Sequence, residues 1–203
     1  MKKLTQADFQ ERRAVLAGEM GLRSIAVIAT SPVAMRNRDA DYKFRADSSF
    51  FYLTGFAEPE AVAVIETFDT AEEGYSYSLF CRERNREMEI WNGYRAGIDG
   101  AVDDYDADEA YAIDLLDEEI VAKLLGKEKI FYRIAEKPEF DTRVNAWLKK
   151  AEQQPRNCVR SYLTEDAVST FHGRHTDNDI MNSYLKSLQI NEKMPHCFFS
   201  ILL

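Results

Sequence analysis

The sequence contains few cysteines, with three among its 203 residues and no C-x-x-C pair. Cys81, Cys158 and Cys197 are odd in number and lie far apart along the chain. A disulfide framework normally uses an even set of cysteines, so this pattern favours a reducing compartment. We therefore predict a cytoplasmic protein.

Long apolar runs are also missing. The longest lie around residues 25–29 and 61–65, which is strand length and far short of the ~20 residues that span a bilayer. The opening Met1-Lys2-Lys3 resembles the charged head of a signal peptide, but polar and charged residues follow where an apolar stretch is required. We expect no export signal and no membrane span.

Basic residues are outnumbered, with 26 Lys and Arg against 35 Asp and Glu and a formal net charge of -9. Such a chain has no broad basic surface to neutralise phosphates, which argues against nucleic acid or an anionic membrane as a partner. Its 45% hydrophobic and 30% charged residues are ordinary values for a soluble globular protein. The length allows one full domain with an appendage, or two small domains.

The glycine patterns of several common active sites are absent as well. No G-x-G-x-x-G, G-x-x-x-x-G-K-[ST] or G-x-S-x-G occurs, so phosphate-binding loops and the serine-hydrolase elbow lack the glycines they require. Cys81 precedes Arg82 at the end of a predicted strand, where a cation favours a thiolate, but no histidine lies in the part expected to fold. We interpret Cys81 as strand-end packing and predict no catalytic residue in this chain.

An acidic segment has part of a calcium-loop pattern. Asp104, Asp106 and Asp108 alternate as calcium ligands do, but Glu109 stands where the loop needs glycine and Leu115 where it needs a bidentate Glu. We therefore interpret the segment as a solvated acidic loop that leads into a helix.

A second group of metal-type residues lies near the carboxyl end. His172, His175, Asp177 and Asp179 are residue types that bind zinc or manganese, but their spacing matches no recognisable site. We interpret them as part of a polar tail and predict no metal ligand in the chain.

Hydrophobic periodicity predicts a mixture of strands and helices. Thr5 should cap a first helix that Gly21 ends, and a later helix from Pro138 should bury Trp147. Strands are predicted at residues 24–30, 50–53, 61–65, 75–80 and 129–132, and a short helix at 120–125.

Residues 50–53 are aromatic on both faces of any strand, so they should form a central strand paired antiparallel with residues 61–65. The polar residues 36–47 read as a loop. We expect a three-layer α/β fold, with a mixed sheet and helices on both faces, over residues 1–156. Residues 157–203 form a separate tail without a clear strand pattern.

One tryptophan lies in an unusual setting. Trp91 follows a run of charged residues and precedes two glycines, so we place it on a loop or short helix. It either covers the domain core or stands at a rim, where its flat ring packs on a ligand or partner.

Two blocks of the sequence resemble one family. The first block comprises RNRDADYKFR at 36–45 and SFFYLTGFAEPEA at 49–61, and the second is EIWNGYRAG at 89–97. Both are similar to signatures of the N-terminal domain of Xaa-Pro aminopeptidases (aminopeptidase P). The resemblance covers residues 5–155. It implies the creatinase-type N-terminal fold, with ribonuclease H-like topology and no ribonuclease chemistry.

In that family the domain precedes a larger metallopeptidase domain, in which two Asp, one His and two Glu hold two manganese ions. The metal-bound water attacks the bond before a penultimate proline. We expect that domain to be absent from this chain, which leaves it inactive alone and without a cofactor of its own. The tail after about residue 164 is a shifted reading frame, a truncation or a divergent end, and the sequence leaves all three open.

The resemblance also implies a role for the domain. In the family it assists oligomer assembly and shapes the mouth of the active site, and Trp91 matches a tryptophan that reaches toward the substrate of another protomer. The expected partners are the metallopeptidase domain, further copies of the chain and, in the full-length context, peptide substrate. The alternative is a stand-alone binding or regulatory module related to the N-terminal domains of creatinases and proline dipeptidases.

Overall fold

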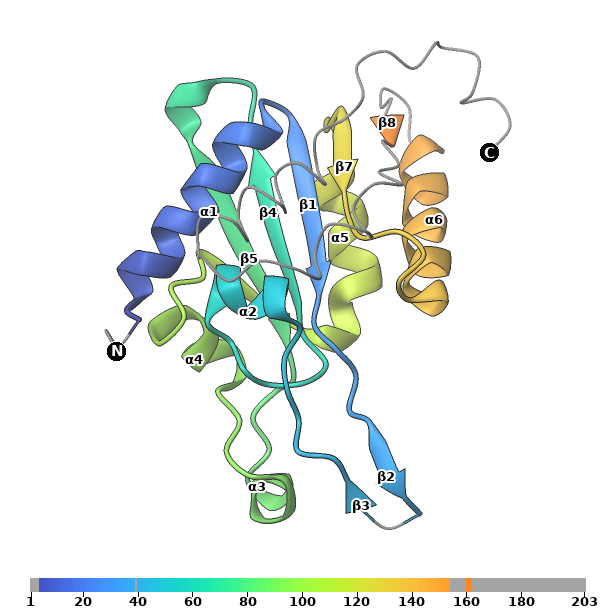
Figure 1. The fold of residues 1–203 in the computed structure, drawn as a ribbon. Helices are drawn as coiled ribbons and strands as arrows, with labels where there is room; N and C mark the ends of the chain where they lie inside the picture. Colours follow the sequence, from blue (N-terminus) through green and yellow to red (C-terminus); the bar gives the residue numbers. More distant parts are fainter. Residues whose placement is uncertain (1–3, 39, 154–159, 162–203) are drawn as a thin grey trace, which may run out of the picture.

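The computed structural model describes residues 4–38, 40–153 and 160–161, and Figure 1 shows their arrangement. At residues 40, 41, 88, 91, 92, 160 and 161 the description covers the backbone only. Cys158, Cys197 and the group from His172 to Asp179 lie outside the described residues, as does nearly all of the predicted tail. The division at residue 156 therefore stays a prediction.

A mixed sheet forms the middle layer of the domain. Its strands are β1 (Ser24–Ala29), β4 (Val62–Thr67), β5 (Tyr75–Cys81), β6 (Glu109–Ala112), β7 (Lys129–Phe131) and β8 (Arg160–Ser161). Their order across the sheet is β6-β5-β4-β1-β7-β8. β4 pairs antiparallel with β1 and with β5, whereas the pairs β1–β7, β5–β6 and β7–β8 are parallel.

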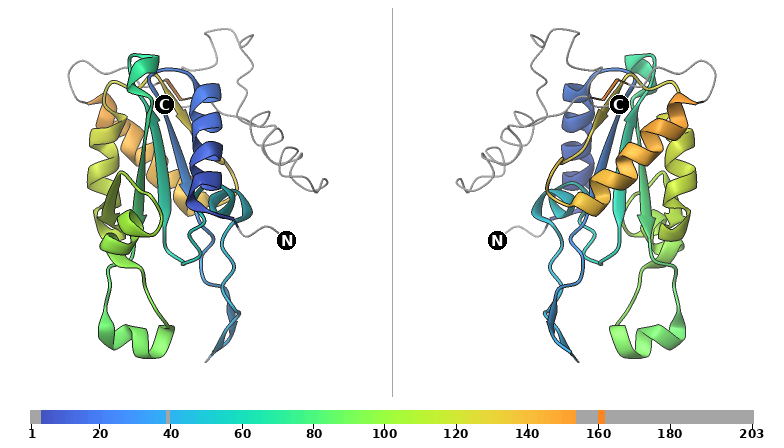
Figure 2. Two further views of the ribbon diagram at one scale, coloured as in Figure 1. Left: turned by 90° about the vertical axis from the view of Figure 1, so that its left-hand side faces the viewer. Right: turned by 90° about the vertical axis from the view of Figure 1, so that its right-hand side faces the viewer.

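Helices cover both faces of this sheet, as Figure 2 shows. One face carries α1 (Gln6–Met20) and α2 (Ser48–Thr54), and the other carries α5 (Leu116–Leu124) and α6 (Pro138–Glu152). Along β4, Ala63 and Ile65 pack into the cluster under α1, while Val62 and Val64 pack into the cluster under α5 and α6. The run of apolar residues is thus explained by burial on both faces, and the predicted three-layer α/β fold is confirmed.

The remaining elements are short. They are β2 (Met35–Asn37), β3 (Ala40–Asp41), α3 (Arg86–Asn92), α4 (Gly97–Asp103), and the 3₁₀ turns η1 (Ala71–Glu73) and η2 (Ile113–Leu115). The segment predicted as a loop at residues 36–47 contains the antiparallel β2–β3 hairpin. The hairpin and α3 extend from the same end of the domain (Figure 1).

Several predicted elements are confirmed. The strands at residues 24–30, 61–65, 75–80 and 129–132 correspond to β1, β4, β5 and β7. The first helix begins as expected, because the Thr5 N–H donates to the Asp8 carboxylate at 2.8 Å and satisfies one of the free groups at the helix start. Trp147 is only 1% exposed, as the apolar face of α6 predicted.

The predicted central strand at residues 50–53 is wrong, because these residues form helix α2. Asp47 caps the helix by accepting from the Ser49 and Phe50 N–H groups at 2.9 and 3.1 Å. Gly55 ends it in the left-handed conformation, with its N–H donating to the Phe51 carbonyl at 2.8 Å. The predicted pairing with residues 61–65 therefore does not occur, and β1 and β5 flank β4 instead.

The acidic segment after residue 99 also departs from expectation. Helix α4 comes first, a loop follows, and the edge strand β6 forms at Glu109–Ala112, within the segment that we expected to be an acidic loop. The helix expected at residues 120–125 corresponds to α5. Within the described part of the chain, no helix has both the length and the apolar character needed to cross a membrane.

Candidate functional site

The candidate site is the segment of residues 82–97, called here the α3 lobe. It leaves the sheet at the end of β5, contains α3 and returns to the body where α4 begins. Figure 1 shows it extending beyond the sheet. The backbone of Trp91 lies in the last turn of α3, so of the two predicted settings, a loop or a short helix, the structure has the short helix. The Trp91 side chain is outside the described atoms, so its role at a substrate entrance stays a prediction.

The two ends of the lobe approach each other closely. Gly97 has a φ of 68°, and a Cβ built on it would lie 2.9 Å from the Arg84 Cβ and 3.2 Å from the Arg84 backbone nitrogen. Only glycine combines this backbone conformation with such an approach. Gly97, the last residue of the EIWNGYRAG block, therefore allows the two ends of the lobe to meet at its base.

Cys81 lies at this base and is buried. The residue is 1% exposed, and its thiol donates to the Gly97 carbonyl at 3.5 Å. Burial, reinforced by the nearby Glu58 carboxylate, raises the pKa of Cys81 to about 12 in spite of the neighbouring Arg82. The thiol is thus protonated near neutral pH and packs at the strand end, as the sequence predicted.

Glu58 connects the lobe with the body of the domain. It lies in the loop before β4, and its carboxylate accepts from the Ala96 N–H at 2.7 Å. The same carboxylate lies 3.7 Å from the guanidinium of Arg82. One side chain therefore contacts residues at both ends of the lobe.

Glu89 braces the lobe from within. Its Oε1 accepts from Arg84 Nε at 3.1 Å and from the Arg95 N–H at 3.3 Å. The Arg84 guanidinium also lies 5.3 Å from the centre of the Tyr94 ring. Sequence reasoning missed Glu58 and Glu89 as positioning groups, although both lie inside the blocks that carried the resemblance.

Apolar side chains are exposed on the lobe and on the β2–β3 hairpin, which extends from the same end of the domain (Figure 1). Ile90 is 79% and Tyr94 63% exposed on the lobe, and Met35 is 78% and Tyr42 59% exposed at the hairpin. A contiguous exposed apolar patch marks a contact surface, so these side chains make this end of the domain a candidate for one.

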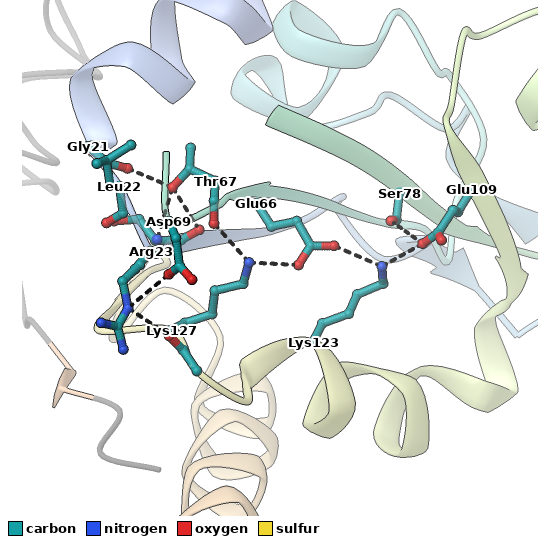
Figure 3. Close-up of polar contacts among 12 residues, drawn as sticks. Gly21, Leu22, Arg23, Glu66, Thr67, Asp69, Ser78, Glu109, Lys123 and Lys127 are labelled. Carbon is teal, nitrogen blue, oxygen red and sulfur yellow. Dashed lines mark hydrogen bonds and ion pairs between the residues drawn. The ribbon is translucent and has the colours of Figure 1, made fainter. Parts of the chain in front are cut away.

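A second polar cluster lies near the end of β4 that is farther from the lobe, beside α5, and is drawn in Figure 3. The Glu66 carboxylate lies 3.0 Å from Lys123 Nζ and 3.1 Å from Lys127 Nζ, and Lys123 also reaches Glu109 at 2.6 Å. These residues line an open hollow of about 420 Å³. Each of the four charged groups has a partner, so we assign the cluster to anchoring α5 on β4 and β6.

The charges of this cluster shift each other's titration. The hydrogen bond from Lys123 is the main reason that the pKa of Glu109 lies below its ordinary value. Burial alone would lower the pKa of Lys123, but its hydrogen bonds to Glu109 and Glu66 outweigh that effect and raise the pKa. Both shifts favour the charged pair.

The Asp104–Asp108 segment is structural in the fold. Asp106 pairs with the buried Arg13 at 2.9 Å, and the Asp108 carboxylate accepts from the Tyr77 N–H at 2.7 Å. Across the described residues, no three His, Cys, Asp or Glu side chains gather closely enough to hold a metal ion. That part of the chain does not fit the manganese pair that the resemblance implies, and we derive no chemical step through it.

Comparison with known proteins tests the family resemblance seen in the sequence. Residues 9–132 match the family model of the aminopeptidase P N-terminal domain. The Xaa-Pro aminopeptidase of Escherichia coli is 34% identical over 165 residues, which is 81% of this chain and 37% of the relative. A mitochondrial intermediate cleaving peptidase 55 of Arabidopsis thaliana is 32% identical over 123 residues, covering 61% of this chain and 24% of the relative.

A solved structure gives the same answer for the fold. Aminopeptidase PepP of Pseudomonas aeruginosa superposes with a TM-score of 0.74 at 35% identity, over 84% of this chain and 38% of that chain. The chain thus spans between a quarter and two fifths of these proteins. On the family match, the shared fold and the motif blocks, the chain belongs to the aminopeptidase P N-terminal domain family.

Proposed function

We propose that this chain serves a Xaa-Pro aminopeptidase as its non-catalytic N-terminal part, with removal of the residue before proline carried out elsewhere. The observation that carries the proposal is the family match over residues 9–132, in a chain that spans 37% of its Escherichia coli relative. Two manganese ions and their bound water belong, in this proposal, to a separate metallopeptidase domain. The part of the chain described here supplies a platform for that domain.

The α3 lobe is the part of the platform that shapes the substrate entrance. Support comes from its extension beyond the sheet and from the exposed Ile90 and Tyr94 beside Trp91 in the sequence. In this role the lobe contacts a neighbouring subunit of a homo-oligomer, and Trp91 packs on the peptide there. Burying ~80 Å² of ligand against the ring contributes about 2 kcal/mol, or roughly thirtyfold in affinity or rate.

The proposed setting is the cytoplasm, on the support of three scattered cysteines, of which Cys81 is a buried free thiol. One relative carries a mitochondrial name, so an organelle is the competing setting. Fractionation of the source cells with an antibody against residues 4–153 tests the proposal, and recovery in an organelle or membrane fraction contradicts it.

Activity is tested first on the chain alone. The purified chain, supplied with manganese and an Xaa-Pro peptide, should show no turnover above the metal-only control. The Escherichia coli Xaa-Pro aminopeptidase, assayed beside it, verifies the conditions. Turnover comparable to that enzyme refutes the proposal.

A chimaera tests the role of the lobe. Residues 1–156 replace the matching region of the Escherichia coli relative, and kcat/KM is compared between the parent chimaera and its Trp91→Ala and Trp91→Phe variants. Trp91→Ala should lower kcat/KM by roughly thirtyfold, because the ring surface is lost, and Trp91→Phe should lower it less. Equal kcat/KM values for all three proteins refute the entrance role.

A further inference from the structure

We infer that Glu58 is a positioning residue that holds the α3 lobe, and with it Trp91, at a fixed place on the body of the domain. Its importance for catalysis rests on the proposed function, because Trp91 matters there only if the lobe faces a substrate. The structural part of the inference concerns this chain alone.

The contacts of Glu58 define a bridge between body and lobe. Glu58 precedes β4, the fully buried strand between β1 and β5, so its backbone belongs to the body. Its carboxylate reaches the Ala96 N–H at 2.7 Å and the Arg82 guanidinium at 3.7 Å. Ala96 and Arg82 lie at opposite ends of the lobe, so one carboxylate contacts both connections. The hydrogen bond to Ala96 is the direct restraint, and the pairing with Arg82 is a looser electrostatic contact.

The surroundings strengthen this bridge. The side chains of Glu58 and Arg82 are 15% and 16% exposed, and Ala96 is 4% exposed. Hydrogen bonds that involve an ionised group are about twice as strong as neutral ones, and shielding from water increases their strength. An exposed ion pair would restrain the lobe far less.

The lobe needs such an external restraint. α3 has seven residues, whereas an isolated helix needs roughly 12 to 15 to be even marginally stable in water. Glu89 braces Arg84 against Arg95, and Gly97 packs beside Arg84, but these contacts join one part of the lobe to another. They close the loop without fixing its direction. The Cys81 thiol at the end of β5 also donates to the Gly97 carbonyl at 3.5 Å, but a thiol is a weak donor. The bond from the Ala96 N–H to the Glu58 carboxylate is therefore the stronger link between the lobe and the body.

The test follows two signals in the full chain. The sequence has two tryptophans, Trp91 in the lobe and Trp147 in the core, so 5-fluorotryptophan labelling gives two ¹⁹F resonances that single Trp→Phe variants assign. Glu58→Ala should shift or broaden the Trp91 resonance and leave that of Trp147 in place. The Ala96 amide should exchange with solvent about tenfold faster, as expected on losing a hydrogen bond to a charged group.

Glu87→Ala is the matched control, because it removes an exposed carboxylate from α3 itself. If Glu58→Ala and Glu87→Ala give the same Trp91 resonance and the same Ala96 exchange rate, the inference is wrong. A displaced Trp147 resonance shows that Glu58→Ala has disturbed the whole fold, and Glu58→Gln then replaces it. Its weaker neutral bond should still speed Ala96 exchange severalfold, and an unchanged rate overturns the inference.

Activity of the chimaera separates this inference from the proposed function. Glu58→Ala should lower kcat/KM in the same direction as Trp91→Ala, and the two effects should not add in the double variant. If the ¹⁹F and exchange changes occur while Trp91→Ala leaves kcat/KM unchanged, the entrance role fails and the role of Glu58 stands. If Trp91→Ala lowers kcat/KM but Glu58→Ala changes neither the Trp91 resonance nor the Ala96 exchange rate, the role of Glu58 fails and the entrance role stands.

Discussion

The body of the domain and the α3 lobe differ in what holds each of them in place. In the body, side chains such as Ile65 and Leu79 are fully buried between helices and sheet. In the lobe, Ile90 and Tyr94 are largely exposed, and the contacts that fix the segment are made by Glu58 and by other polar groups. Apolar burial therefore sets the stability of the body, whereas a few directed contacts set the position of the lobe.

The largest effect on stability should come from Trp147→Ala in the body. The Trp147 ring packs edge-on against the Phe140 ring, with 5.6 Å between the ring centres, and its Nε1 donates to the Asp117 carboxylate at 2.6 Å. Removing a buried aromatic leaves a cavity, so the free energy of unfolding should fall by about 3 to 5 kcal/mol. Urea denaturation of the chain measures it. A fall below ~1 kcal/mol means that α6 does not bury this face.

Gly97→Ala should have the next largest effect, and it probes the base of the lobe. A Cβ at this position meets both a positive φ of 68° and the nearby Arg84. The expected loss is about 1 to 3 kcal/mol in urea denaturation. Gly93→Ala is the matched control, because its φ is 80° and nothing lies within 4 Å of the added Cβ. Equal losses for the two variants would show that the approach to Arg84 costs nothing.

The ion cluster on the body predicts a smaller effect that depends on pH. Since the pKa of Glu109 is lowered in the folded chain, mainly by Lys123, its contribution is present above the unfolded pKa near 4.3. The contribution is lost as the pH falls through the lower folded pKa. The Glu109 side chain is 48% exposed, so the loss should stay below about 1 kcal/mol.

Glu109→Gln should therefore flatten the acid side of a plot of unfolding free energy against pH. Lys123→Met removes the partner of Glu109 and should flatten the same region. Urea denaturation of both variants between about pH 3 and pH 7 measures this, a window that brackets the ordinary Glu pKa. An acid limb as steep as that of the unaltered chain in both variants would show that the pair contributes nothing.

Much of the body was readable from the sequence, because burial on both faces leaves continuous apolar runs. Residues 61–65 gave β4 directly, and the apolar stripe of α6 placed Trp147 in the core. The error at residues 50–53 has a local cause. The N-cap at Asp47 and the left-handed Gly55 favour a helix, and that helix exposes Phe51 at 40% while Phe50 and Leu53 are buried.

The parts that depend on distant partners were not readable. Strand β6 lies in an acidic segment. It is stabilised by the pairing of residues 109–112 with β5 and by the ion pair between Glu109 and Lys123. The Glu58 carboxylate binds the Ala96 N–H, 38 positions away along the chain, and the sequence around either residue does not predict such a contact. Trp91 was placed on a loop or a short helix from its neighbours, and the structure has the helix. Its contact with a substrate of another subunit stays a prediction.

The smallest effect on stability should come from Ile90→Ser at the exposed surface of the lobe. The Ile90 side chain is 79% exposed, so its loss removes almost no burial and the free energy of unfolding should change by less than about 0.5 kcal/mol. Urea denaturation should give overlapping curves for the two proteins. In the chimaera, however, Ile90→Ser should weaken subunit association, measured as a lower mass at equal concentration by light scattering. An unchanged mass would mean that the lobe is exposed without being a contact surface. A change above about 1 kcal/mol in the free energy of unfolding of the isolated chain would mean that the lobe, like the body, is held by apolar burial.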